Sequence, residues 1–402
     1  MSEYQRYEFM TIDRPLTKKQ LDEVNNLSSH IEASSTHAFI EYHWGDFKHD
    51  PVKVLHQYFD AFLYWANWGS PRLAFRFPHG VLPSNLLDGY DVGEDVVFTQ
   101  HADYDTLDIH FGEMESPEIL VDYELGSLAP IREELMEGDM RALYIAWLAS
   151  QGMLFDRYDD EEKNWDEDEY EVEEENEGMP DGHTDETDYE GVPAVPPAFN
   201  QLTGAQQALA ELLQVPRELL NAVARHSREM MTSNQYDFTA LIQKLPETRR
   251  IDYLVRLARN EPGLSRLLTV ELRKLSGSET ETQQTTGEHI PYPILLAESK
   301  EIRAKQEREE REKEERARLS HLQDIQEHQD VYWRQIEMAV AKAAGAKYDD
   351  AVRLLVDLRD AAEQFQTTQE FYARFNTWVR SYLHRPGLLQ RLQQHKFTIP
   401  KS

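Results

Sequence analysis

The 402-residue sequence contains no cysteine. Disulfide bonds, thiolate zinc sites and cysteine nucleophiles are therefore excluded. No apolar stretch approaches the roughly 20 residues that a membrane-spanning helix needs, and residues 1–13 lack the basic and then apolar regions of a secretory signal. These absences predict a cytoplasmic protein with no membrane partner.

Sequence motifs for catalysis are also missing. The chain has no phosphate-cradling glycine loop, no Gly-x-Ser-x-Gly turn and no His-Glu-x-x-His zinc motif. We therefore expect no enzyme activity and no cofactor, with an enzyme of unknown type in the N-terminal part as an alternative.

Charge is plentiful and unevenly placed. The chain has 74 Asp or Glu against 42 Lys or Arg, a formal net charge of −32, and residues 156–190 alone hold 19 acidic and two basic residues. A segment this charged cannot bury enough apolar surface to offset the entropy lost on ordering. With the proline-rich residues 192–197, it predicts a disordered acidic linker over residues 153–198.

This linker divides the predicted domains. Residues 1–152 are expected to form an α+β domain, in which helices surround a small, mostly antiparallel sheet. Residues 199–276 are expected to be all-α, residues 277–297 a second linker, and residues 298–397 a long charged helix followed by a helical hairpin.

Hydrophobic spacing predicts the elements of the α+β domain. Thr17 is the expected N-cap of a helix over residues 16–31, and Asp50 with Pro51 opens a helix that we extend through an aromatic run to residue 67. A further long helix is expected at residues 128–152. Strands are expected at residues 38–47, 72–77, 96–99 and 106–111.

The charged helix has an unusual composition. Residues 298–318 contain eight acidic and eight basic residues, many spaced by four as in Glu312 and Arg316. Each such pair stabilises a helix by roughly 0.2–0.5 kcal/mol. The spacing predicts a solvent-exposed rod, and leaves open whether it stands alone or forms a coiled coil.

Several segments of the chain resemble segments of other bacterial proteins. The C-terminal matches are ALIQKLP (240–246), YLVRLA (253–258), YDDAVRLLVDLRD (348–360) and RPGLLQRL (385–392). In this order they resemble the helical C-terminal region of bacterial proteins that carry a SWIM-type zinc finger. The finger itself needs cysteine ligands, which this chain lacks, so the resemblance does not imply a zinc site here. The N-terminal segments YEF (7–9), IDRPL (12–16) and WGDF (44–47) resemble an uncharacterised bacterial family.

One candidate binding site is a helix-turn-helix-like pattern at residues 208–223. Arg217, Asn221 and Arg225 are the side chains there that could contact nucleic-acid bases. Gln214 occupies the turn position where glycine is usual, which favours a plain helical hairpin.

Three other groups suggest chemistry but have simpler interpretations. Histidines and a carboxylate near residues 37–56 have metal-ligand chemistry but no ligand spacing, so we expect surface or capping roles and no metal site. The aromatic run at residues 58–68 is expected to be core. The carboxylates Asp103, Asp105 and Asp108 carry little information in so acidic a chain. The metal candidates are His37, His43, Asp46, His49 and His56.

These observations predict a non-enzymatic interaction or adaptor protein with two binding parts joined by the acidic tether, and a protein as its partner. The alternative is a nucleic-acid-associated accessory factor that acts through the helical half. Residues 203–276 support it, because they hold 11 Lys or Arg against eight Asp or Glu. The oligomeric state is left open.

Overall fold

The computed structural model describes residues 4–82, 88–90, 92–112, 123–165, 191–229, 237–259, 261, 264–275, 287–342 and 345–400. The chain divides into two compact units, Met1–Ile302 and Arg303–Ser402. Each unit is described by itself below.

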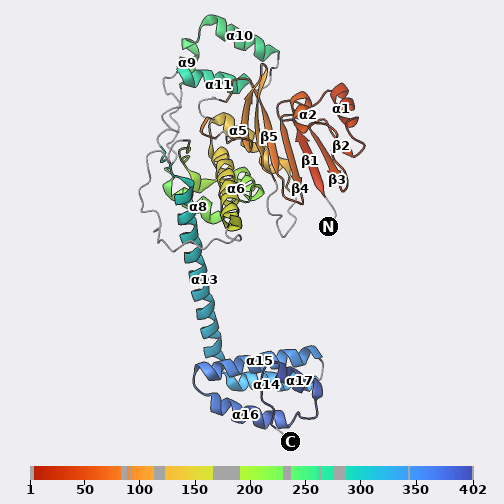
Figure 1. Ribbon diagram of the computed structural model, residues 1–402, viewed down its shortest axis with the longest axis vertical. Coiled ribbons are helices and arrows are strands. Elements are labelled where there is room, and N and C mark those ends of the chain that lie inside the picture. The colour runs from red at the N-terminus through yellow and green to blue at the C-terminus, as the bar shows by residue number, and fades with distance from the viewer. Residues whose placement is uncertain are drawn as a thin grey trace. The chain divides into compact units, whose positions relative to one another are not determined.

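The first unit contains a seven-stranded antiparallel sheet with strand order β2-β3-β1-β4-β5-β7-β6 (Figure 1). The α+β fold class is confirmed, as are the strands at residues 72–77, 96–99 and 106–111. The strands are β1 (Gln5–Met10), β2 (Ile31–Ala33), β3 (His37–Tyr42), β4 (Ala61–Ala66), β5 (Arg72–Pro78), β6 (Val96–Gln100) and β7 (Tyr104–His110).

Two helices on one face of the sheet begin where the sequence signals place them. The first ends at Asn25, so the helix expected over residues 16–31 is too long, and residues 31–33 form strand β2. Thr17 caps α1 (Lys18–Asn25) in a capping box with Gln20, and Asp50 accepts hydrogen bonds from the first turn of α2 (Pro51–Tyr58). Both caps satisfy amide groups that a helix start leaves unpaired.

The second of these helices is shorter than expected. It ends at Tyr58, and the aromatic run that we assigned to it forms strand β4 in the middle of the sheet. Phe62 packs in the core beside α1 and α2, whereas Leu63 and Trp65 pack in the core on the other face. A strand buried on both faces is apolar at nearly every position, so its pattern resembles that of a buried helix.

The other face of the sheet is covered by α4 (Leu125–Leu128), α5 (Pro130–Glu137) and α6 (Arg141–Trp165). The single helix expected at residues 128–152 is wrong, because Gly138 ends α5 in the left-handed region with φ of 91°. Glycine adopts this conformation without the steric cost that a Cβ atom adds. Helix α6 continues to Trp165, into the expected linker, and residues 166–190 lie outside the described residues.

The chain after residue 190 belongs to the same unit. Val195 is buried in the core that the sheet shares with α7 (Gly204–Leu212) and α8 (Arg217–His226), and its amide donates to the carbonyl of Glu288 at 2.9 Å. The proline-rich stretch expected as a spacer is thus packed, and the helices of residues 199–226 share a core with the sheet. The main boundary lies between Ile302 and Arg303 instead.

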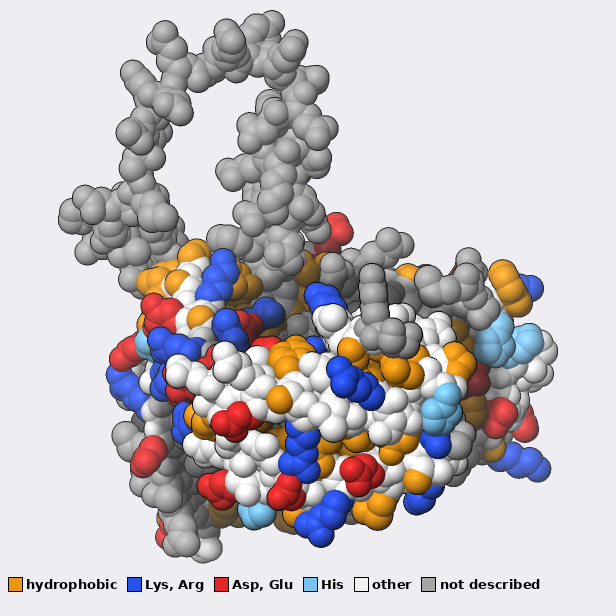
Figure 2. All heavy atoms as spheres, turned by 90° about the horizontal axis from the view of Figure 1, so that it is seen from below, with side chains coloured by type: hydrophobic (Ala, Val, Ile, Leu, Met, Phe, Trp, Pro, Cys, Tyr) orange, Lys and Arg blue, Asp and Glu red, His pale blue; other side chains and the backbone are white. Residues whose placement is uncertain are grey.

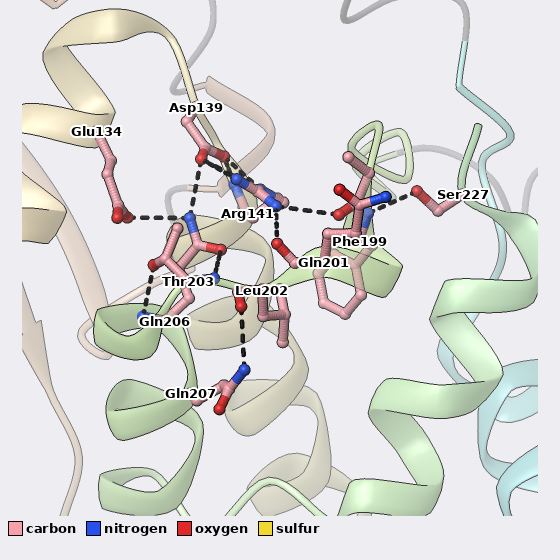
Figure 3. Close-up of polar contacts among 11 residues, drawn as sticks. Glu134, Asp139, Arg141, Phe199, Gln201, Leu202, Thr203, Gln206, Gln207 and Ser227 are labelled. Atoms are coloured by element: carbon pink, nitrogen blue, oxygen red, sulfur yellow. Dashed lines mark hydrogen bonds and ion pairs between the residues drawn. The ribbon is translucent and has the colours of Figure 1, made fainter. Parts of the chain in front are cut away.

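A buried arginine connects α6 to this returning segment (Figure 3). Arg141 is 6% exposed, pairs with the Asp139 carboxylate at 2.6 Å, and donates to the carbonyls of Ala198 at 3.0 Å and Gln201 at 2.7 Å. The amide of Gln206 in α7 donates to Asp139 at 2.9 Å. Burial raises the pKa of Asp139, but the bonds and charge of Arg141 outweigh it and hold the pKa below its usual value.

Arg141→Met should loosen α7 and α8 from the sheet. The change removes the cationic partner of the buried Asp139 carboxylate and the side-chain donor to the Ala198 and Gln201 carbonyls, which we expect to cost about 3–5 kcal/mol. Amide hydrogen exchange of residues 204–226 in the full chain measures this. Arg217→Met is the control, because that side chain is 86% exposed. Unchanged exchange in Arg141→Met would show that the connection does not hold these helices.

The second unit is a helical bundle with one core. It contains the continuation of α13 (Tyr292–Glu327), then α14 (Gln329–Ala341), α15 (Gly345–Gln364), α16 (Thr368–Arg380) and α17 (Pro386–Gln394). Trp333, Leu355 and Phe375 are among its most buried side chains. The expected helical C-terminal region is confirmed.

The expected charged helix lies within α13, in which residues 303–321 are all exposed. The expected pair Glu312–Arg316 forms at 3.4 Å, while Arg303–Glu307 and Lys305–Glu309 pair in the opposite order along the helix. Among the helices that the structure describes, none is long and apolar enough to cross a bilayer.

Leu355→Asp should unfold the second unit, because it places an unpaired charge at a fully buried position, at a cost of several kcal/mol. The amide hydrogens of residues 329–394 should lose their protection from exchange, while those in the sheet of the first unit should remain protected. Met338→Asp is the matched control, since Met338 is 61% exposed. Full protection in Leu355→Asp would contradict the assigned core.

Candidate interaction surface

A layer of three short helices lies in the first unit (Figure 1). It consists of α9 (Phe238–Lys244), α10 (Glu247–Ala258) and α11 (Leu264–Leu275). Its buried core is small, formed by Leu241, Leu245 and Leu272 with Leu268 packed against them. Only Tyr253 of α10 is buried, so most of this helix is exposed to solvent.

Tyr253 fixes which side of α10 faces inward. Its hydroxyl donates to the Glu271 carboxylate of α11 at 2.5 Å, and the guanidinium groups of Arg249 and Arg256 lie over its ring at 5.3 and 5.6 Å. Burial and the bond to Glu271 raise the pKa of Tyr253 to about 12, so the hydroxyl keeps its proton. The opposite side of α10 is thereby turned to solvent.

The exposed part of α10 carries an apolar stripe, which we define as Ile251, Leu254, Val255 and Leu257. These side chains are 53%, 64%, 42% and 65% exposed. By helical spacing Ile251 and Val255 lie opposite Tyr253, whereas Leu257, four residues after Tyr253, lies beside it. A single exposed leucine is ordinary, whereas a contiguous apolar group on the surface makes this helix a candidate interaction surface.

Two arginines lie at opposite ends of the stripe. Arg250 is four residues before Leu254 and Arg259 four residues after Val255, so each is a surface neighbour of the stripe. Both are exposed, and neither forms an ion pair with a carboxylate of the described residues.

Acidic groups are near as well. Glu247 is exposed four residues before Ile251, and the hydrogen bond and charge of Arg256, with the charge of Arg259, lower the pKa of Glu261. The charge around the stripe is therefore mixed.

The candidate base-contacting residues lie on α8. Arg217, Asn221 and Arg225 are exposed and four residues apart, so the structure brings them to one face, opposite the buried Leu219 and Val223. Gln214 adopts the left-handed conformation, with φ of 53°, at the turn position where glycine is usual. The α7–α8 hairpin thus has a helix-turn-helix-like turn without the glycine.

The metal candidates do not converge. His37 contacts Glu8 at 2.6 Å, His56 contacts the Thr106 hydroxyl at 2.9 Å, and Asp46 accepts from Gln5 at 2.9 Å. The rings of His43 and His49 pack against those of Tyr4 and Phe47. Throughout the part of the chain that is described, no group of three such ligands could hold a metal.

His56 lies in an aromatic neighbourhood that favours its neutral form. Burial lowers its pKa, and the nearby His101 and Arg76 lower it further. The Tyr104 ring lies 4.7 Å from the His56 ring, between centroids. These contacts give His56 a packing role at the edge of the sheet.

The three carboxylates of the β6–β7 hairpin are also separated. Asp103 is exposed in the loop, and Asp108 pairs with Arg72 at 2.6 Å. Asp105 is fully buried and accepts from His79 at 2.9 Å and from the Gly80 amide at 2.7 Å. A carboxylate that orients a histidine is part of many catalytic sites, but among the described residues no hydroxyl bonds to His79. The pair closes a turn.

The aromatic run is core, as expected, because Phe59, Phe62 and Trp65 are at most 5% exposed. The sequence analysis missed His79 and the apolar stripe of α10. The signal for the stripe is visible in the sequence, since α10 has apolar residues on more of its circumference than one buried face needs. Which of them are exposed depends on how Tyr253 docks.

The second unit offers an open groove of about 480 Å³ between α13 and α15, lined by Arg318, Leu319, Leu322 and Gln364 with Glu314 and Glu315. Arg318 is already paired there with Asp357 and Asp360. Figure 2 shows acidic and basic side chains interspersed over the face that it presents, with apolar side chains between them. Neither observation favours a ligand of one charge sign.

Comparisons with known proteins do not supply a function. No family model matches the chain, and no curated protein or solved structure matches it. The surfaces described above are therefore the basis for assigning a role.

Proposed function

We propose that this protein is a cytoplasmic, non-enzymatic adaptor that binds a protein partner through the apolar stripe of α10. The exposed stripe is the observation that carries the proposal. Fully burying a Leu, Ile or Val side chain contributes about 1.5–3 kcal/mol relative to leaving it exposed. Covering four side chains that are about half exposed thus offers several kcal/mol to a partner.

The division into two compact units supports the adaptor role. Each unit has its own core, and the boundary at Ile302 and Arg303 falls within α13. We assign the joining role to this helix and not to the acidic run, because the chain returns to the first unit after residue 190. In the proposal, the second unit supplies the other binding surface.

Leu254→Asp should abolish partner binding without unfolding the protein. Leu254 is 64% exposed, so the added carboxylate costs little in the free chain, but a partner that covers the stripe would remove it from water and lose the apolar contact. The test is purification of the tagged full-length protein from its native host after nuclease treatment, with quantification of stoichiometric partners. The matched control is Met338→Asp in the second unit, at 61% exposure.

Loss of a stoichiometric partner in Leu254→Asp alone supports the proposal, provided that the thermal melting of both variants equals that of the original protein. A partner retained equally by both variants would place the binding surface elsewhere. No nuclease-resistant partner at all would remove the adaptor function.

The second candidate is a nucleic-acid-associated accessory factor, which the shared exposed face of Arg217, Asn221 and Arg225 favours. The resemblance to the helical region of SWIM-finger proteins points the same way. Charge weakens this candidate, because Arg217 lies 3.7 Å from Glu211 and the neighbouring Glu218 is on the same helix.

If this candidate is correct, the full chain should bind a short DNA or RNA duplex at low salt, with affinity that falls steeply as salt rises. Arg217→Ser with Arg225→Ser should weaken binding at least tenfold. Arg353→Ser, at a 74% exposed position of the second unit, should not. Absence of binding at low salt would exclude this role.

A further inference from the structure

We propose that His226 is the centre of a proton-dependent latch that holds the start of α13 against α8. The latch consists of His226, the last residue of α8, with Glu288 before α13 and Glu298 within it. This inference is independent of the apolar stripe of α10. It follows from what the two ring nitrogens of His226 contact.

Both ring nitrogens of His226 face a carboxylate. Nδ1 lies 3.3 Å from Oε2 of Glu288, and Nε2 lies 3.0 Å from Oε1 of Glu298. A neutral imidazole carries a single N–H, so it donates to one of these oxygens and turns a lone pair toward the other. An imidazolium has an N–H on each nitrogen and donates to both. Only the protonated ring therefore satisfies the two contacts together.

Partial burial makes the two protonation states differ more. The side chains of His226 and Glu298 are 21% and 26% exposed, and Oε2 of Glu298 is buried with no hydrogen-bond partner among the described residues. A carboxylate removed from water is destabilised unless a cation or several donors compensate it. The imidazolium is the cation at this position, so loss of its proton leaves Glu298 poorly compensated.

The elements around His226 favour the same state. The C-terminal turn of α8 carries partial negative charge from its carbonyl groups, which stabilises a cation at this position. Residues 191–201, which pack beside α8, contain no charged side chain. In the segment before α13, His289 donates from Nδ1 to the carbonyl of Val192 at 2.7 Å. The other charged residues beside the latch in sequence are all exposed: Arg225, Arg228, Lys300 and Glu301.

The latch matters because α13 continues into the second unit. Tyr292 and Leu295 bury the first turn of α13 in the core of the first unit, and the contact between His226 and Glu298 secures the next turn. Imidazole side chains change charge between about pH 5 and 8. The latch is therefore complete at the acidic end of this range and loses a hydrogen bond as the pH rises, which loosens α13 near residues 298–302.

Amide hydrogen exchange of the full chain at about pH 5.5 and about pH 8 tests the latch across this range. Rates are expressed as protection relative to an unstructured peptide at the same pH. Protection of residues 298–302 should be roughly three- to tenfold lower at the higher pH, the effect of about one lost hydrogen bond. The amides of α15 in the second unit serve as an internal reference, and their protection should change less.

Two variants should remove this pH dependence. The amide of His226→Gln donates to Glu298 at either pH, and the amide of Glu298→Gln can donate to an unprotonated ring nitrogen. His289→Gln is the matched control. It should keep the dependence, because the bond from His289 to a carbonyl needs only one N–H and forms equally well with a neutral ring.

Three outcomes would overturn the inference. The first is equal protection of residues 298–302 at both pH values in the original chain. The second is a pH dependence that persists in His226→Gln and Glu298→Gln, since another group would then be its source. The third is loss of the dependence in His289→Gln as well. The two latch variants change the contact from opposite sides, so one of them suffices if the other does not fold.

Discussion

The arrangement of the first unit depends on one buried guanidinium. Arg141, at the start of α6, joins the turn at Asp139 to the carbonyls of Ala198 and Gln201. These residues are nearly 60 positions later in the chain, so the contact closes a long loop whose entropy opposes it. Ala198 is held there with φ of 54°, in a region that costs a non-glycine residue about 1 kcal/mol or more. The Ala198 carbonyl also accepts from the backbone amide of Gln201 at 2.9 Å, so Arg141 adds a second donor there and binds the Gln201 carbonyl as well.

This connection has consequences for the rest of the unit. It places η3 (Phe199–Gln201) and α8 against the core, and the same segment reaches the start of α13 through the backbone bond between Val195 and Glu288. His226, at the end of α8, lies 3.0 Å from Glu298 in α13. The acidic run thus leaves from and returns to one folded body.

The sequence predicts the parts of this fold that are set by local chemistry. The caps at Thr17 and Asp50, the β6–β7 hairpin and the short helices after residue 199 follow from neighbouring residues alone. Strand β4 does not, because burial on both faces removes the alternation that identifies a strand. The sequence also does not predict that α7 and α8 pack in the same core as the sheet. The hydrogen bonds of Arg141 that hold them there join residues on either side of the acidic run. The candidate surface is predictable only in part. Local spacing predicts helix α10, but which of its side chains are exposed, such as Leu254, depends on the contact between Tyr253 and Glu271.

The α9–α11 layer has a small core and an outer surface with many exposed apolar side chains. Three leucines form its buried core, whereas seven large apolar side chains among its described residues are more than a third exposed. The Tyr253 hydroxyl and the Arg249 guanidinium both bond to Glu271, so these polar contacts orient α10 on α11 without covering it. Under the proposed function, a partner would meet a surface that is already oriented, so the entropy of ordering the helix would not be lost on association.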